Sequence, residues 1–258
     1  MLVLIGLGLF DEKDLSLRGI EEAKKANKVY IELYTTAWFG DLEKLEEIIG
    51  KKIKVLKRKD LEENSGKILE EAKTQDIAIF VGGDPLVATT HSALILEARK
   101  RGIKTEVIHN SSIFSAIAET GLHIYKFGSC VTIPFLEKTR GKLPESVYET
   151  IKMNKARGLH TLCLLDIDTE ENKLMSVKEA LEILLRLEEV RKDKIISTND
   201  KIIVFSRAGS KEMKIFFKCI KDLMEFEIKL PAVLIVPGSL HFTEKEFLET
   251  MISSSLHD

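Results

Sequence analysis

The sequence predicts an α/β protein, because short apolar segments alternate with amphipathic segments along the chain. The segment from Ile77 to Val81 is continuously apolar and is followed by Gly82 and Gly83, a pattern typical of a strand buried on both faces of a sheet. Glycine and small-residue turns also follow other apolar segments. The chain has 258 residues, which is enough for one large domain or two smaller ones.

Strands and helices are expected to alternate through residue 121, as in a parallel sheet covered by helices. Ser16 is expected to cap the first helix, because its hydroxyl can accept a hydrogen bond from the first helical turn. Leu42 and Leu45 recur at core-facing helical spacing in the second helix. The expected strands are 2–5, 28–32, 53–56, 77–81 and 104–108, and the expected helices are 16–26, 41–49, 61–73, 85–101 and 112–119.

A second alternation begins after Gly128, so the sequence predicts two α/β domains, 1–127 and 128–258. Neither a repeat nor a proline-rich linker separates the halves, and a cleft between them is the expected ligand site. The expected strands of the second half are 131–134, 161–166, 201–206 and 233–236, and the expected helices are 145–155, 177–191 and 217–223.

Composition argues against several classes of protein. The 39 basic and 41 acidic side chains give a net charge of −2, which is unlike a protein whose affinity comes from neutralising phosphates, so nucleic acid is not expected as a partner. Three cysteines without CxxC spacing and scattered histidines indicate neither disulfides nor a metal site, and favour a cytoplasmic protein. No apolar run approaches the roughly 20 residues that span a bilayer, so no membrane association is expected.

The turn after the strand 77–81 is the most informative candidate site. Asp84 occupies the position of a helix cap, and Pro85 suits a first helical position because proline lacks the amide hydrogen that would be unpaired there. A capped turn with no further role explains this pattern equally well. The functional interpretation is that a carboxylate beside close-approaching backbone binds a ligand.

The segment from Gly6 to Leu9 resembles the start of a dinucleotide-binding turn, and Glu32 follows roughly where a ribose-binding carboxylate would lie. The third glycine of that pattern is due at Asp11, where a carboxylate would repel a pyrophosphate. A tight glycine turn is therefore the favoured interpretation.

No nucleophile elbow or phosphate-binding loop is present either, and no residue stands out as a general base. Glycine turns without acid–base residues suit a reagent that is already activated, such as a methyl group on a sulfonium.

Four segments together resemble the diphthine synthases in residues, order and spacing. The resemblance extends from Met1 to about Phe247, and its most specific parts are the second and third segments. The four segments are Gly6 to Leu9, Gly83 to His91, Gly121 to Gly128 and Gly158 to Ile167.

The resemblance implies two α/β domains of the tetrapyrrole methylase type, with S-adenosylmethionine held in a cleft between them, usually in a homodimer. It also implies methylation of the amino group of a modified histidine on translation elongation factor 2, a step in diphthamide biosynthesis, with release of S-adenosylhomocysteine. Carried over by position, the family's cofactor contacts fall on Leu9, Asp84, Val87, Ser112, Ile113, Leu165, Ala208 and Ala232.

Several alternatives stay open. The family includes compact archaeal forms that trimethylate and longer eukaryotic forms that add a fourth methyl as an ester, and the compact length of this chain favours trimethylation. Other possibilities are a small-molecule methyltransferase with a tetrapyrrole-like acceptor and a non-catalytic cofactor-binding protein. His91 and Glu119 are candidates to assist removal of a proton, with a purely structural role as the alternative for each.

Overall fold

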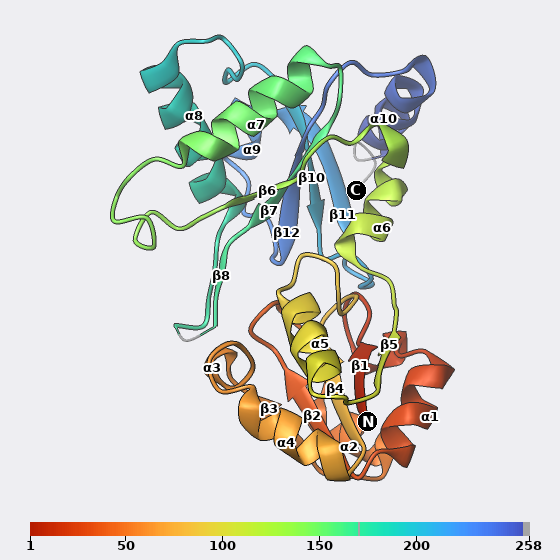
Figure 1. The fold of residues 1–258 in the computed structure, drawn as a ribbon. Helices are drawn as coiled ribbons and strands as arrows, with labels where there is room; N and C mark the ends of the chain where they lie inside the picture. The colour runs from red at the N-terminus through yellow and green to blue at the C-terminus, as the bar shows by residue number, and fades with distance from the viewer. Residues whose placement is uncertain (170, 255–258) are drawn as a thin grey trace. The chain divides into compact units, whose positions relative to one another are not determined.

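The computed structural model describes residues 1–169 and 171–254. The chain divides into two units, Met1–Ala116 and Ile117–Asp258, a division that lies earlier in the chain than the expected boundary at residue 127. Figure 1 shows both units as mixed α/β structures, as the sequence predicts. Among the described residues, no helix is both long and apolar enough to cross a membrane.

Unit 1 is built on a five-stranded sheet in which every pairing is parallel. The strand order is β3-β2-β4-β1-β5. Gly6 at the end of β1 lies opposite Val81 at the end of β4, so the turns after these two strands begin side by side. The strands are β1 (Leu2–Gly6), β2 (Lys28–Glu32), β3 (Ile53–Leu56), β4 (Ile77–Val81) and β5 (Thr105–Ile108).

Helices cover both faces of this sheet. On one face, α1 (Leu17–Lys25) and α2 (Leu42–Ile49) bury Ala23 and Leu45 against Val3 and Ile5. The other face is covered by α3 (Arg58–Glu62), α4 (Gly66–Thr74) and α5 (His91–Lys100). The Ser16 hydroxyl accepts a bond from Gly19 N, which confirms the predicted cap of α1. Short helices η1 (Glu12–Asp14) and α6 (Ile113–Ala116) complete the unit.

The predicted helix 85–101 is wrong in its first part, because α5 begins only at His91. Asp84 does bond a following amide, Leu86 N, but Ala88 then adopts a left-handed φ of 56° that breaks any helix. The segment 84–90 is therefore a loop, and it carries two of the candidate site residues to the edge of the sheet.

Unit 2 contains a second five-stranded sheet of order β11-β10-β12-β7-β6, in which only β6 and β7 are parallel. The expected helix 217–223 is wrong: its first half belongs to β11, which pairs with β10, and only α9 (Ile220–Leu223) is helical. The strands are β6 (Val131–Ile133), β7 (Thr161–Leu165), β10 (Lys201–Ser206), β11 (Lys214–Cys219) and β12 (Ala232–Val236).

One face of this sheet packs against α7 (Glu145–Ala156), α8 (Val177–Arg191) and α9, around the fully buried Tyr148 and Leu184. A small hairpin of β8 (Ile167–Asp168) and β9 (Lys173–Leu174) extends from β7. Short helices η2 (Ile117–Thr120) and η3 (Ile124–Lys126) begin the unit, and α10 (Phe242–Ser254) follows β12.

Candidate functional site

The carboxyl edge of the unit 1 sheet has the topology of a ligand site. The chain leaves β1 toward α1 on one face of the sheet, and leaves β4 toward α5 on the other. Adjacent parallel strands whose connections diverge in this way form a switch point, where open α/β sheets bind their ligands. Here the two turns are also tied together, because Gly8 and Gly83 exchange backbone hydrogen bonds of 3.2 Å and 2.9 Å.

Glycine is required in the turn after β1. A Cβ on Gly6 would lie 2.6 Å from the carbonyl oxygen of Gly83 and 2.7 Å from Asn110 Cβ. Gly8 has a φ of 85°, and a Cβ there would lie 2.4 Å from Asp14 Cβ. The glycines therefore allow three backbone segments to meet, as the tight-turn interpretation predicts, and no pyrophosphate-binding pattern is needed to explain them.

Asn110, in the turn after β5, joins the third segment to the other two. Its side-chain amide donates to Gly6 O at 2.9 Å and to Asp14 O at 3.0 Å. Its own backbone amide donates to Asp84 Oδ2 at 3.2 Å. One residue thus links the turns after β1, β4 and β5 by hydrogen bonds at the carboxyl edge of the sheet.

Asp84 links two turns through hydrogen bonds and does not cap a helix. Its carboxylate, 6% exposed, accepts from Leu86 N at 3.0 Å through Oδ1 and from His109 Nδ1 at 2.8 Å through Oδ2. With the Asn110 amide, these bonds fix the start of the loop 84–90 against β5. A carboxylate oxygen can accept two hydrogen bonds, so Oδ1 keeps one acceptor position for a ligand.

We expect Asp84→Ala to lower both the stability of the protein and its affinity for the cofactor. The change leaves Leu86 N and Asn110 N without their acceptor, and we expect a loss of about 1 to 3 kcal/mol in the free energy of unfolding and a similar loss in binding. Urea melts and calorimetry measure the two separately. Asp200→Ala is the control, because Asp200 also accepts a backbone hydrogen bond, from Ser197 N at 2.9 Å, but belongs to unit 2, before β10.

The other unit 1 residues implied by the resemblance lie on the same three turns. Leu9 follows the Gly8 bridge, Val87 lies in the loop 84–90, and Ser112 and Ile113 follow Asn110. Leu9, Val87 and Ile113 are half-buried, as apolar walls of a site should be. A Cβ on Gly83 would lie 3.5 Å from Ser112 Cβ, so the glycine leaves space beside the serine. These features fit a small apolar group held against backbone.

The three unit 2 candidates gather at one edge of their own sheet. Ala232 begins β12 and pairs with Ser206, two residues before Ala208. The next residue of β12, Val233, pairs with Leu164, so Leu165 lies at the same edge. Arg207 N donates to Pro231 O at 2.8 Å and holds the turn containing Ala208 against β12. Strand pairing thus brings together three positions that are far apart in sequence.

The structure places His91, one of the two candidates for proton removal, where it cannot readily take up that role. His91 is 2% exposed, and its Nε2 donates to the fully buried Glu32 at 3.1 Å. Glu32 also accepts from Tyr34 N and Thr35 N, so it anchors the loop after β2 and is not available to a ribose. Glu119 is exposed on η2. Both His91 and Glu32 therefore serve the protein's own structure.

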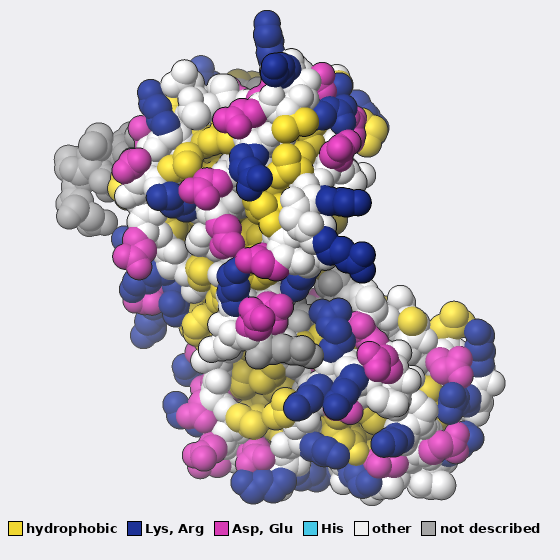
Figure 2. Space-filling view, turned by 90° about the vertical axis from the view of Figure 1, so that its left-hand side faces the viewer, with side chains coloured by type: hydrophobic (Ala, Val, Ile, Leu, Met, Phe, Trp, Pro, Cys, Tyr) yellow, Lys and Arg dark blue, Asp and Glu magenta, His cyan; other side chains and the backbone are white. Residues whose placement is uncertain are grey.

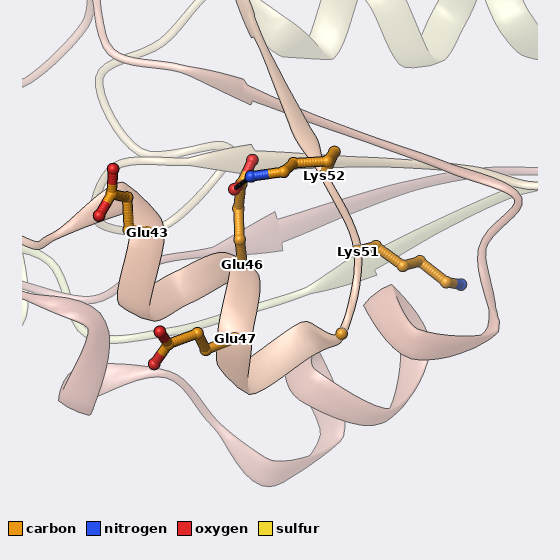
Figure 3. A pocket seen from close by; sticks show the side chains of 6 residues that line it. Glu43, Glu46, Glu47, Lys51 and Lys52 are labelled. Carbon is orange, nitrogen blue, oxygen red and sulfur yellow. Dashed lines mark hydrogen bonds and ion pairs between the residues drawn. The ribbon is translucent and has the colours of Figure 1, made fainter.

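A surface hollow at the end of α2 offers no competing site (Figure 3). Gly50 and Lys52 line it and lead into β3, so it lies at the amino edge of the unit 1 sheet, opposite the glycine turns. Both of its lysines bond within the protein: Lys52 Nζ lies 2.6 Å from Glu46 Oε2, and Lys51 Nζ bonds Lys24 O and Ala26 O. Basic and acidic side chains are interspersed on the face that Figure 2 shows.

Comparison with known proteins agrees with the fold. Residues 1–223 match the tetrapyrrole (corrin/porphyrin) methylases, which defines the class of protein. A diphthine synthase of Methanocaldococcus jannaschii is 48% identical over 253 residues, which are 96% of this chain and 98% of that protein. A diphthine synthase of Methanococcus vannielii is 45% identical over 256 residues, which are 98% of this chain and 100% of that protein.

A crystal structure of diphthine synthase has a TM-score of 0.88 with 36% sequence identity, covering 97% of this chain and 95% of that one. The chain belongs to the diphthine synthase family of the tetrapyrrole methylases.

The sequence did not reveal the hydrogen bonds that His109, Asn110 and Glu32 make between these turns. His109 and Asn110 follow β5 as a polar pair directly after an apolar strand, the same signal that drew attention to Asp84. Glu32 was considered only as a ribose ligand, and its bond to His91 spans 59 positions. The signal that could have found these residues is the recurrence of polar side chains at the carboxyl ends of neighbouring strands.

Proposed function

We propose that this protein transfers methyl groups from S-adenosylmethionine to the amino group of a modified histidine on translation elongation factor 2, in diphthamide biosynthesis. It is a methyltransferase that depends on S-adenosylmethionine, as the diphthine synthase family is. The observation that carries the proposal is the identity of 48% to a diphthine synthase over 96% of the chain.

The proposed cofactor contacts are Leu9, Asp84, Val87, Ser112 and Ile113 in unit 1, with Leu165, Ala208 and Ala232 in unit 2. The half-buried Leu9, Val87 and Ile113 suit adenine and the apolar carbons around the sulfur. The remaining acceptor position of Asp84 suits a polar hydrogen or the cationic end of the cofactor. Gly6, Gly8 and Asn110 hold these turns in place.

Bound S-adenosylmethionine supplies a methyl group on a sulfonium, which already carries its leaving group. Held by the candidate contacts, it would supply this methyl group to the deprotonated acceptor amine, with S-adenosylhomocysteine as the leaving product. The protein's contribution is to orient the reactants, which can account for a large share of the acceleration in a two-reactant step. Solvent or a backbone carbonyl accepts the amine proton in this scheme, since His91 is buried and engaged with Glu32.

Three transfers to one nitrogen give a trimethylammonium product. Trimethylation is supported by the 48% identity to a diphthine synthase of M. jannaschii, because archaeal members of the resembled family trimethylate. A homodimer in the cytoplasm completes the proposal, in line with the arrangement usual for the resembled family.

A small-molecule acceptor is the main competing function, because tetrapyrrole methylases share this fold. Incubation with isotope-labelled S-adenosylmethionine distinguishes the two. The acceptor is either elongation factor 2 that carries the modified, unmethylated histidine or a tetrapyrrole. We expect label only in the protein acceptor. Label in the tetrapyrrole alone would overturn the proposed acceptor, and cofactor binding without transfer to either would indicate a non-catalytic protein.

A further inference from the structure

The loop 84–90 is anchored at both ends to the turns after other strands of the sheet. At its start, Asp84 is bonded to the turn after β5. At its other end, His91 is the first residue of α5, and its Nε2 lies 3.1 Å from Glu32 Oε1 at the end of β2. Thr90 adds a weaker tie through its hydroxyl, which donates to Glu62 Oε1 at 3.2 Å. The loop therefore spans from β5 to β2 across the carboxyl edge.

Glu32 is held by several hydrogen bonds in a position to accept one from His91. The carboxylate is 0% exposed and accepts from Tyr34 N at 3.1 Å, from Thr35 N at 3.2 Å and from the Thr35 hydroxyl. Since a carboxylate acts as acceptor in each of these bonds, His91 is the donor in the fourth. Removing the imidazole would leave part of a buried carboxylate without a partner, which is costly in a site that water does not reach.

The conformation of the loop needs such anchors. Ala88 has a φ of 56°, in the left-handed region that an alanine rarely adopts, and this strain must be offset by the surrounding bonds. Within the loop, the Thr89 hydroxyl donates to Pro85 O at 2.6 Å and Val87 N donates to Asp84 O at 3.2 Å. These local bonds shape the loop, while Asp84 and His91 fix where it lies.

We propose that His91 and Glu32 are positioning residues, which hold Asp84 and Val87 in the conformation that binds the cofactor. The proposal rests on the proposed function, because it presumes that S-adenosylmethionine binds at this loop. His91 does not act on the reacting atoms itself. It acts through the loop that ends at its backbone.

Unit 2 contains a matched pair that serves as a control. His160 Nε2 lies 3.1 Å from Glu244 Oε1, and both side chains are 0% exposed. The chemistry and the distance are those of the His91–Glu32 pair. However, His160 precedes β7, and so lies at the opposite edge of its sheet from Leu165. Loss of either imidazole removes a buried donor, but only one of the two bonds holds a candidate cofactor loop.

The experiment compares His91→Ala, His91→Gln and His160→Ala by calorimetric titration with S-adenosylhomocysteine, with urea melts to record stability. Both alanine variants should lose stability. His91→Ala should raise Kd about tenfold or more, as expected for losing a hydrogen bond to a charged group. His91→Gln carries an amide that can still donate to Glu32, and should stay within about threefold of wild type. His160→Ala should also stay within about threefold.

A wild-type Kd for folded His91→Ala would overturn the positioning role, and so would an equal rise in His160→Ala. If His91→Ala does not fold, His91→Leu tests the same bond, because its side chain fills much of the space of the imidazole but cannot donate to Glu32. A wild-type Kd for that variant would likewise overturn the proposal. Failure of the wild-type protein to bind S-adenosylhomocysteine would instead overturn the proposed function, and the positioning role with it.

Discussion

Gly8→Ala should disrupt the hydrogen-bonded turns after β1 and β4 and abolish most cofactor binding. An alanine at φ 85° is strained, and its Cβ would lie 2.4 Å from Asp14 Cβ. Left-handed backbone and overpacking together predict a loss of about 2 to 5 kcal/mol in the free energy of unfolding. Because Gly8 also bonds Gly83, the displaced turn would move the loop 84–90, and we expect Kd to rise at least about tenfold.

Gly50→Ala is the matched control for this change. Gly50 has a φ of 71°, but a Cβ there would meet nothing within 4 Å. It should therefore cost only the backbone strain, about 1 kcal/mol, and leave cofactor affinity unchanged. Urea melts and calorimetric titration on both variants measure the two effects. Equal effects of the two substitutions would show that the close approach at Gly8 does not support the site.

Glu244 should make a large side-chain contribution to the stability of unit 2. Its carboxylate is 0% exposed and accepts from Lys126 Nζ at 2.6 Å, His160 Nε2 at 3.1 Å and the backbone amides of His123 and His241. Burial alone would raise its pKa, but these donors outweigh burial and lower it from 4.5 to about 2. The same burial lowers the pKa of His160 and keeps its imidazole neutral.

The folded pKa of Glu244 lies below the unfolded value, so its stabilisation is fully present above pH 4.5 and is lost as the pH falls toward 2. The shift corresponds to about 3 kcal/mol. Glu244→Gln should remove this stabilisation at neutral pH, and the variant should lose less further stability between pH 4.5 and 2 than wild type does. Thermal melts across this range measure both. Glu70→Gln, which removes an exposed carboxylate paired with Lys73 at 2.8 Å, should change little. Parallel acid curves for wild type and Glu244→Gln would contradict this role.

Elements with strong local signals were predicted well from the sequence. The strands 53–56, 77–81 and 201–206 and the helix 177–191 have the predicted bounds, because apolar runs and helical periodicity specify them locally. The helices expected over 85–101 and 217–223 are wrong in their first parts, because contacts with residues distant in sequence determine the structure there. Asp84 is engaged by His109 across 25 positions, and Phe217 pairs with Ile203 in the β10–β11 hairpin.

The turns of the candidate site could be predicted from the sequence, but the way in which the fold brings them together could not. The glycines after β1 and β4 are visible in the sequence, and so is Asp84. The order of the strands, which places β1 beside β4, depends on long-range packing that no local pattern records. The gathering of Leu165, Ala208 and Ala232 likewise follows from antiparallel pairing in unit 2. Their assignment to a cofactor depended on the resemblance to a family.

The most direct test of the central claim is the intact mass of elongation factor 2 that carries the unmethylated histidine precursor, after incubation with this protein and S-adenosylmethionine. The account predicts a mass increase of three methyl groups with wild type, and a much slower increase with Gly8→Ala. Four added methyl groups would indicate the methyl ester product and contradict trimethylation. An unchanged mass, with S-adenosylhomocysteine binding confirmed by calorimetry, would contradict the proposed acceptor.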